Sequence, residues 1–160
     1  MIKLIALLFT ITIANANIFP FFLPDEGSFF NHHLQKLLKN SQKEIVIVTP
    51  SLNYSSLSKS IINSISHGGH LTLIVSNPSG DPLRFIAYKG VSLFTYTPHV
   101  LADTLILIDN SYVCHLSGSL NEKNLSDNVS NVWCSDDSTV ILATQKQINT
   151  LIKRSKPYLQ

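Results

Sequence analysis

The stretch LADTLILIDNSYVCHLSGSLN, from Leu101 to Asn121, carries the most informative pattern in the sequence. An apolar run, TLILID, ends at Asp109, and a second run, YVCHL, follows after a short polar turn. Two runs of this kind joined by a short turn predict a pair of antiparallel strands. The tetrapeptide GSLN, residues 118–121, comes soon after the second run. The stretch therefore predicts a strand, a turn and a second strand, with polar residues at both ends of the unit.

The composition is that of one folded domain. The chain has 160 residues, of which 44% are hydrophobic and 14% are charged, and this balance excludes a disordered chain. A chain of this length buries a substantial core. The sequence contains no repeat, no low-complexity tract and no linker long enough to separate a second domain. We therefore expect a single domain over residues 17–160.

The first sixteen residues have the features of a secretory signal. Lys3 precedes the apolar run LIALLFTITI, which Ala14-Asn15-Ala16 follows. A basic start, a short apolar core and an A-x-A ending predict cleavage before Asn17. The alternative is a retained membrane anchor, because residues 18–23 (IFPFFL) are also apolar, but prolines interrupt this run and it is shorter than the roughly 20 residues of a membrane helix. We expect a signal peptide over residues 1–16, no transmembrane segment after cleavage, and a periplasmic or secreted protein.

Without the signal the chain is close to neutral. Loss of Lys3 leaves eleven Lys and Arg against ten Asp and Glu, a net charge of +1. Only two of the basic residues are arginines, Arg84 and Arg154. A general nucleic-acid binder carries a broad basic field, which this composition excludes. Any contact with nucleic acid would have to be local.

Helix-like and strand-like segments alternate along the chain. Apolar spacing predicts helices over residues 23–42, 55–69, 81–90, 119–125 and 145–156. Strand patterns cover residues 44–50, 70–77, 91–97, 104–109, 112–116 and 129–135, and residues 138–143 (STVILA) are expected to extend the sheet. Strand–helix alternation followed by hairpins predicts an α/β fold in which helices flank a mixed β-sheet on both faces.

In this order of elements the chain resembles a single-motif member of the phospholipase D superfamily, and is similar to the small exported bacterial nucleases of that group. Residues 23–76 follow the family's frame of helix, strand, helix, glycine turn and strand. GVSLFTY corresponds to the strand before the catalytic motif, LADTLILID to the motif strand, and GSLN to a downstream Gly-Ser-x-Asn. The resemblance covers residues 21–142 and implies a phospholipase D-like fold.

The family's catalytic histidine and lysine have no counterparts in this chain. In the family they stand two residues apart on the motif strand, so that both reach one phosphate. The histidine attacks phosphorus, and the histidine of a second copy protonates the leaving oxygen. Counted back from Asp109, the resemblance places the two positions at Ala102 and Thr104, and a supporting glutamate near Ser130. A methyl group has no lone pair and a threonine hydroxyl has no charge, so the resemblance implies lost catalysis.

His115 is the candidate for a relocated catalytic group. It lies on the strand after the motif strand and would face the family's pocket if the hairpin, which is about two residues longer than usual in the family, shifted the register. The alternative is a half-buried histidine held by a hydrogen bond. His99 follows Pro98 and is expected in a loop. For the remaining histidines we expect solvated side chains: His32, His33, His67 and His70.

The retained polar residues each have a structural and a functional interpretation. Ser119 and Glu122 fit a capping box, in which the serine caps the following helix. The resemblance instead implies that Ser119, Asn121 and the N-terminus of that helix form a seat for a phosphate. Asp109 either caps the hairpin turn or orients a catalytic group. The sequence leaves these alternatives open.

Cys114 and Cys134 are the only cysteines, and both lie in strand-like runs. An oxidising compartment favours a disulfide, and the alternative is two buried free thiols. The family's frame implies that the two strands are neighbours, which would bring facing cysteines within bonding distance. Apart from His115, no other cysteine or histidine lies at ligand spacing beside either one, so we expect no metal site. No cofactor is expected.

Two functions from different classes follow. The first is an exported, non-catalytic phospholipase D-like domain that binds a phosphate-containing ligand or a protein partner. Because single-motif relatives pair about a two-fold axis, that partner would be a second copy or a catalytic relative. The second is an active phosphodiesterase or nuclease with relocated catalytic groups, such as His115. The missing His-x-Lys pair favours the first.

Overall fold

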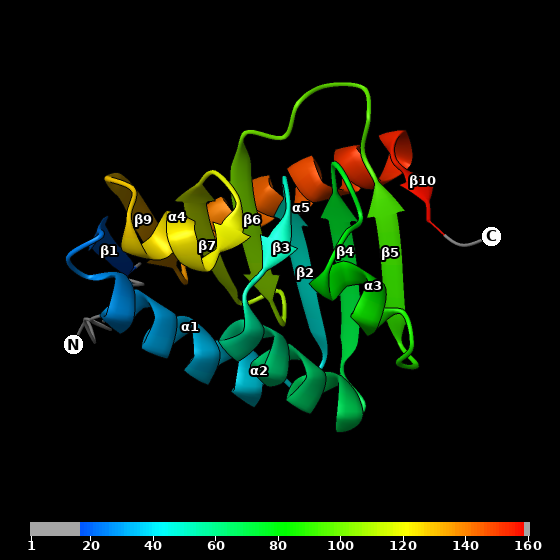
Figure 1. Ribbon diagram of the computed structural model, residues 1–160, viewed down its shortest axis with the longest axis horizontal. Coiled ribbons are helices and arrows are strands. Elements are labelled where there is room, and N and C mark those ends of the chain that lie inside the picture. The colour runs from blue at the N-terminus through cyan, green and yellow to red at the C-terminus, as the bar shows by residue number, and fades with distance from the viewer. Residues whose placement is uncertain (1–16, 159–160) are drawn as a thin grey trace, which may run out of the picture.

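An eight-stranded mixed β-sheet forms the centre of the protein (Figure 1). The computed structural model describes residues 17–158. From edge to edge the strands are β1 (Ile18–Leu23), β9 (Ser130–Ser135), β7 (Tyr112–Ser117), β6 (Asp103–Ile108), β2 (Glu44–Thr49), β4 (His70–Val75), β5 (Val91–Thr95) and β10 (Lys156–Pro157). Strands β2, β4 and β5 are parallel, and the other neighbouring pairs are antiparallel. A small second sheet pairs β3 (Leu52–Asn53) with β8 (Leu120–Asn121).

Helices cover both faces of the large sheet. One face carries α1 (Gly27–Asn40) and α2 (Ser55–Ser66) and is called the α1/α2 face, while α5 (Ser138–Arg154) crosses the opposite, α5 face (Figure 1). The short helices α3 (Asp81–Phe85) and α4 (Glu122–Ser126) lie on the α1/α2 side. The predicted fold class, a mixed sheet with helices on both faces, is confirmed. Within residues 17–158, no helix is both long enough and apolar enough to cross a membrane.

Alternation along the central strands divides the core into two layers. On β6, Ile106 and Ile108 belong to the layer under α1 and α2, whereas Leu105 and Leu107 belong to the layer under α5. Strand β2 divides in the same way and is buried on both faces, which explains its near-continuous apolar sequence. Successive residues of a central strand therefore lie on opposite faces of the sheet, and facing residues of neighbouring strands lie on the same face.

The sequence pattern did not predict strand β1. Its apolar residues pair with β9 at the edge of the sheet, so they are not part of a membrane span. The Phe22 N–H donates to Glu26 Oε2 at 2.7 Å, and the Phe22 carbonyl accepts from the Glu26 N–H at 2.9 Å. The backbone N–H and carbonyl of Phe22 thus point away from β9. The backbone of Pro20, two residues earlier, points the same way because alternate residues of a strand share an orientation. Proline is tolerated here because its missing N–H would not have faced the ladder.

The expectation that STVILA extends the sheet is wrong. These residues form the first turns of α5, which continues without a break to Arg154. The reason is the residue before them: Asp137 Oδ1 accepts from the N–H groups of Thr139 and Val140 at 2.7 and 3.0 Å. An aspartate in this position starts a helix, because it binds N–H groups that have no partner in the first turn.

A disulfide joins β7 to β9. Cys114 lies directly opposite Cys134 in the ladder, and the two sulfur atoms are bonded. Both residues belong to the core on the α1/α2 face, with 1% and 0% of their surface exposed. The predicted pairing of Cys114 with Cys134 is confirmed.

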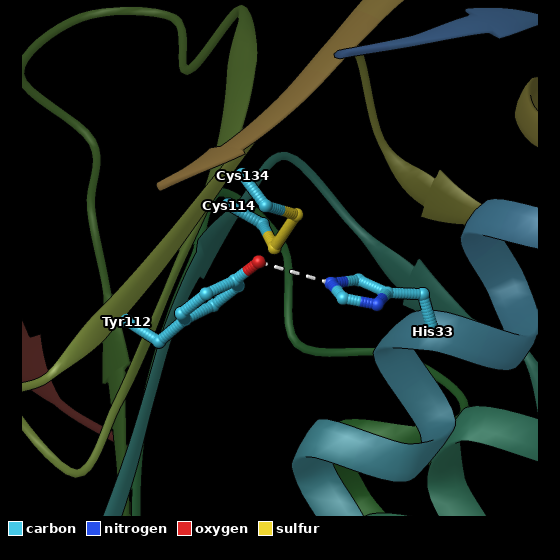
Figure 2. The surroundings of a disulfide bond; sticks show 4 residues. All are labelled: His33, Tyr112, Cys114 and Cys134. Atoms are coloured by element: carbon cyan, nitrogen blue, oxygen red, sulfur yellow. Dashed lines mark hydrogen bonds between the residues drawn. A yellow bond between two sulfur atoms is a disulfide. The ribbon is translucent and has the colours of Figure 1, made fainter. Parts of the chain in front are cut away.

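A histidine–tyrosine pair lies beside this disulfide (Figure 2). His33 Nε2, from α1, lies 3.1 Å from the Tyr112 hydroxyl, so His33 is not the solvated side chain that we expected. Burial, aided by the charge of Asp136, raises the pKa of Tyr112 to about 12. Burial, with smaller contributions from Lys36 and His32, lowers the pKa of His33. Both rings are therefore neutral at pH 7, which suits their position over the core.

Candidate functional site

The positions that the sequence resemblance assigns to the family's histidine and lysine lie at the start of β6, beside the end of β2. Ala102 is an exposed residue just before β6. Thr104, two residues further on, has 0% of its surface exposed. It shares its face of the strand with Ile106, which is the α1/α2 face. The position of the lysine is therefore buried in this chain.

The hydroxyl of Thr104 belongs to a buried network of hydrogen bonds. Thr104 Oγ1 donates to the Gly118 carbonyl oxygen at 2.6 Å and lies 2.8 Å from Thr49 Oγ1. Thr49 Oγ1 also lies 2.9 Å from the Ser51 carbonyl oxygen and accepts from the Leu120 N–H at 3.1 Å. The two hydroxyls have two protons for three close oxygen contacts. Both protons are thus engaged within the protein.

This network joins three segments that are distant in sequence. The β2–β6 ladder ends with Val48 opposite Leu105, so Thr49 and Thr104 are the next facing pair. Gly118 belongs to the turn that leaves β7, and its N–H donates to the Ala102 carbonyl oxygen at 2.9 Å. The end of β2, the start of β6 and this turn therefore close over one another at the place where the family's site would open.

Asn124 fixes the conformation of the Gly-Ser-x-Asn turn. Its Nδ2 donates to the carbonyl oxygens of Ser117 and Ser119 at 2.7 and 2.9 Å. Gly118, between them, has φ of +80°, and a Cβ there would lie 3.0 Å from Asn124 Nδ2. Glycine is thus needed at position 118 for two structural reasons: the positive φ and the closeness of the Asn124 side chain.

The capping box that was expected from Ser119 and Glu122 is wrong. The cap of α4 is Asn121, whose Oδ1 accepts from the Asn124 N–H at 2.8 Å. Leu120 and Asn121 are extended because they pair with β3, so the helix begins two residues later than a serine cap requires. The oxygen of Asn121 is therefore occupied in capping α4, and its amide nitrogen is the group that can donate to a phosphate.

His115 lies on the opposite face of the sheet from Thr104. In the β6–β7 ladder His115 faces Leu105, whereas Thr104 faces Leu116. Facing residues share one side of a sheet, so His115 belongs to the α5 face. The register shift that would bring His115 into the family's pocket does not occur, and this placement is a correction to the sequence-based hypothesis.

His115 has partners of its own on the α5 face. Its Nε2 lies 3.7 Å from Asp103 Oδ2, and its ring stacks on Trp133 with 5.3 Å between centroids and 15° between planes. A pocket of about 350 Å³ adjoins this pair and is lined also by His99 and Ala102. The sequence left as an alternative a half-buried histidine held by a hydrogen bond: His115 is half-buried, but its contacts are the Asp103 carboxylate at 3.7 Å and the Trp133 ring.

Asp109 has a structural role that differs from capping its own turn. Its carboxylate accepts from the Ser41 hydroxyl at 2.8 Å and from the N–H groups of Gln42, Lys43 and Glu44 at 2.9 to 3.0 Å. Burial by itself raises the pKa of Asp109, but these four hydrogen bonds together outweigh it and lower the pKa. Asp109 thus ties the β6–β7 turn to the loop between α1 and β2.

Thr49 and Asn124 are the site residues that sequence reasoning missed. The one available signal for Thr49 was a polar residue at the end of the apolar run EIVIVTP. Asn124 gives no signal, because its role depends on the turn that it contacts. Ser130, near the position of the family's glutamate, has a buried hydroxyl without a hydrogen-bond partner in the described part of the chain. Over residues 17–158 no three His, Cys, Asp or Glu side chains are grouped closely enough to bind a metal ion.

Comparison with known proteins finds solved structures with a similar fold. Neither a protein-family model nor a curated protein matches this sequence. Among solved structures, NucT from Helicobacter pylori is similar with a TM-score of 0.81 and 16% identity over 89% of this chain and 99% of that one. Nuc, a phospholipase D family member from Salmonella typhimurium, is similar with a TM-score of 0.77 and 13% identity over 91% and 99%. Phosphatidylserine synthase from Haemophilus influenzae Rd KW20 is similar with a TM-score of 0.72 and 17% identity over 91% of this chain and 41% of that one.

The fold of this chain is phospholipase D-like. The match covers 99% of the length of both NucT and Nuc. Identities of 13 to 17% establish the architecture and leave the chemistry to the side chains of this chain.

Replacement of Thr104 by valine tests the buried network. Valine keeps the shape of threonine but removes the hydroxyl, which leaves the Gly118 carbonyl and the Thr49 hydroxyl short of one partner each. We expect the free energy of unfolding to fall by about 2 kcal/mol in urea denaturation. The control is Thr72→Val, since the hydrogen bond of Thr72 Oγ1 to Glu44 Oε1 is long at 3.4 Å. Equal losses in the two variants would contradict the network's importance.

Replacement of Asp109 by asparagine tests the tie between the two loops. Asparagine adopts positive φ readily, as the value of 51° at Asp109 requires, but it cannot accept all four hydrogen bonds. At pH 7 we expect a loss of roughly 1–2 kcal/mol in the free energy of unfolding.

The difference from wild type should depend on pH. Because folding lowers the pKa of Asp109, its contribution is complete above the unfolded value of about 3.9 and is lost as the pH falls through the folded pKa. Urea denaturation at pH 7, 4.5 and 3 measures this. Asp127→Asn, at an exposed carboxylate that accepts from the Ser126 hydroxyl, is the control. A loss that stays constant down to pH 3 would exclude the assigned role.

Proposed function

We propose that this protein is an exported, non-catalytic phospholipase D-like domain whose role is to bind a second protein chain. The observation that carries the proposal is the buried hydroxyl network at Thr104. The family's mechanism needs a charged group at this position that points toward a phosphate. Here the side chain is uncharged, fully buried and hydrogen-bonded inside the protein.

Loss of the nucleophile and loss of the lysine support one another. Ala102 offers a methyl group where the family's histidine would attack phosphorus. A lysine at position 104 would place an ammonium among Thr49, Gly118 and Leu120, which is a costly location for a charge without a partner carboxylate. Groups that act together in catalysis also fail together, so residual turnover is expected to be negligible.

A protein partner fits this end of the sheet better than a phosphate. The hydrogen-bond partners of Thr104 are Thr49 and Gly118, neither of which brings a positive charge. In the loop that leads into β6, Val100 has 89% of its surface exposed, and Ala102 is exposed beside it. Exposed apolar surface such as that of Val100, even beside a charged group such as Asp103, suits a protein interface. Single-motif members of the family pair about a two-fold axis at this end, so the partner is a second copy or a catalytic relative.

Export is supported by two separate features. The Cys114–Cys134 bond is of a kind that persists in oxidising compartments. The first sixteen residues have the composition of a secretory signal. These two features together support the proposed periplasmic or secreted location.

A relocated active site is the second candidate function, and one observation favours it. Asp103 and His115 form a carboxylate–imidazole pair beside a pocket of about 350 Å³ that His99 also lines. A carboxylate that orients a histidine is a common part of general-base catalysis. This site would lie on the α5 face, away from the family's pocket.

An activity assay separates the two candidates. Purified protein should show no hydrolysis of single-stranded DNA, double-stranded DNA or bis-p-nitrophenyl phosphate above background. His115→Ala should give the same trace as wild type, because the proposal assigns that residue no catalytic step. Metal-independent cleavage that disappears in His115→Ala would overturn the non-catalytic proposal and identify a site on the α5 face.

Sedimentation tests the binding role when the partner is a second copy. Wild type should form a dimer in the micromolar range, and Val100→Asp should shift the dissociation constant upward by at least tenfold, because an aspartate would be desolvated in the interface. Val129→Asp is the matched control, since Val129 is 90% exposed but lies before β9, in a different loop. A monomer at all concentrations would exclude self-association and leave a catalytic relative as the proposed partner.

A further inference from the structure

Asn17, the first residue that the structure describes, is held by three hydrogen bonds to Asp136. Its backbone nitrogen donates to Asp136 Oδ1 at 2.9 Å, and its side-chain Nδ2 donates to Oδ2 at 3.3 Å. The Asn17 carbonyl oxygen accepts from the Asp136 N–H at 3.4 Å. Both carboxylate oxygens of one exposed aspartate thus face a single residue.

This contact stands one position beyond the β1–β9 ladder. The ladder begins with Ile18 opposite Ser135, so Asn17 lies opposite Asp136. An ordinary ladder would join the Asn17 nitrogen to the backbone carbonyl of its neighbour, but here the nitrogen donates to the side-chain carboxylate. The acceptor is therefore a full negative charge in place of a peptide dipole.

Two adjacent aspartates have different tasks at this point in the chain. Asp137 Oδ1 accepts from Thr139 and Val140 and caps α5. Asp136 is turned toward Asn17 instead, and the hydrogen bonds from the backbone and then the side chain of Asn17 lower the pKa of Asp136. Capping the helix thus does not account for Asp136.

Signal cleavage changes the chemistry of the Asn17 nitrogen. A signal peptidase adds water across the Ala16–Asn17 peptide bond, so Ala16 leaves with the new carboxylate and Asn17 keeps the nitrogen as a primary amine. That α-amine has a pKa of about 7.7–8.0 in unstructured chains and is mostly protonated at neutral pH. A neutral N–H donor would thus become an ammonium 2.9 Å from a carboxylate oxygen.

We propose that Asp136 is the seat for the α-ammonium that cleavage before Asn17 creates, and that this ion pair fixes the free end of β1. Cleavage adds a positive charge to the donor, so a hydrogen bond from a neutral N–H to a carboxylate becomes an ion pair between an ammonium and that carboxylate. The edge strand is thereby fastened at its N-terminal end by Asp136, as Glu26 fastens it at Phe22. The cleavage that removes the signal peptide therefore also creates the ammonium group that holds the start of β1 against Asp136.

The test removes the charge of Asp136 and the charge of the N-terminal amine, separately and together. Full-length genes for wild type and Asp136→Asn are exported, and the first residue of each product is read by N-terminal sequencing. Half of each sample is then acetylated on the α-amine near pH 6, where lysines are protonated and unreactive. Hydrogen exchange of the β1 amides that face β9, those of Phe19, Phe21 and Leu23, is measured at low ionic strength.

Asparagine keeps an oxygen acceptor, so the cycle isolates the charge pair. With a free terminus, Asp136→Asn should speed exchange about two- to fivefold, the range expected for an exposed ion pair. With an acetylated terminus the same substitution should have a clearly smaller effect, because only the hydrogen bonds to the carboxylate are then weakened. Asp127→Asn should leave exchange unchanged in both forms.

Two results would overturn the proposal. One is a product whose first residue is not Asn17, since its amine would not meet Asp136. The other is an equal effect of Asp136→Asn on free and acetylated protein, which would show that a hydrogen bond alone acts here. Comparison of acetylated with free wild-type protein tests the same contact even if Asp136→Asn folds poorly. In that comparison acetylation should speed exchange, and unchanged exchange counts against the ion pair.

Discussion

The contact between the hydroxyls of Thr49 and Thr104 is the constraint on which the site depends. It joins the end of β2 to the start of β6, and through Gly118 and Leu120 it holds the turn that follows β7. A lysine cannot occupy the same space without opening all three segments. Thr104 is uncharged and fully buried, so this position is part of the core of the protein.

The two faces of the sheet separate the side chains that a reader of the sequence would combine. His115 and Thr104 lie on neighbouring strands, but the β6–β7 register places them on opposite faces. The contact with Asp103 and the stack on Trp133 are the interactions of the imidazole on the α5 face, beside the loop of residues 97–102. Sequence proximity is thus a poor guide to catalytic partnership in a sheet, where one residue of register decides the face.

Most of the architecture was predictable because burial follows periodicity. The buried strand EIVIVT, the helix over residues 27–40 and the pairing of Cys114 with Cys134 follow from apolar spacing and from the family's frame. Strand β1 was missed because IFPFFL has the composition of a membrane-proximal run, and a proline hid the edge strand. STVILA was mistaken for a strand because its β-branched residues outweigh one capping aspartate in a local pattern. The cap at Asn121 and the role of Asn124 depend on contacts between turns, which no local pattern contains.

The backbone of β1 limits the ways in which these molecules can meet. Along its outer edge the donors belong to residues 18, 20 and 22, of which Pro20 has none and Phe22 gives its own to Glu26. An incoming strand would find a broken row of donors, and the sheet cannot grow from molecule to molecule on that side. A proline and a glutamate six residues apart thus protect this edge of the sheet from the amyloid-like stacking of further strands.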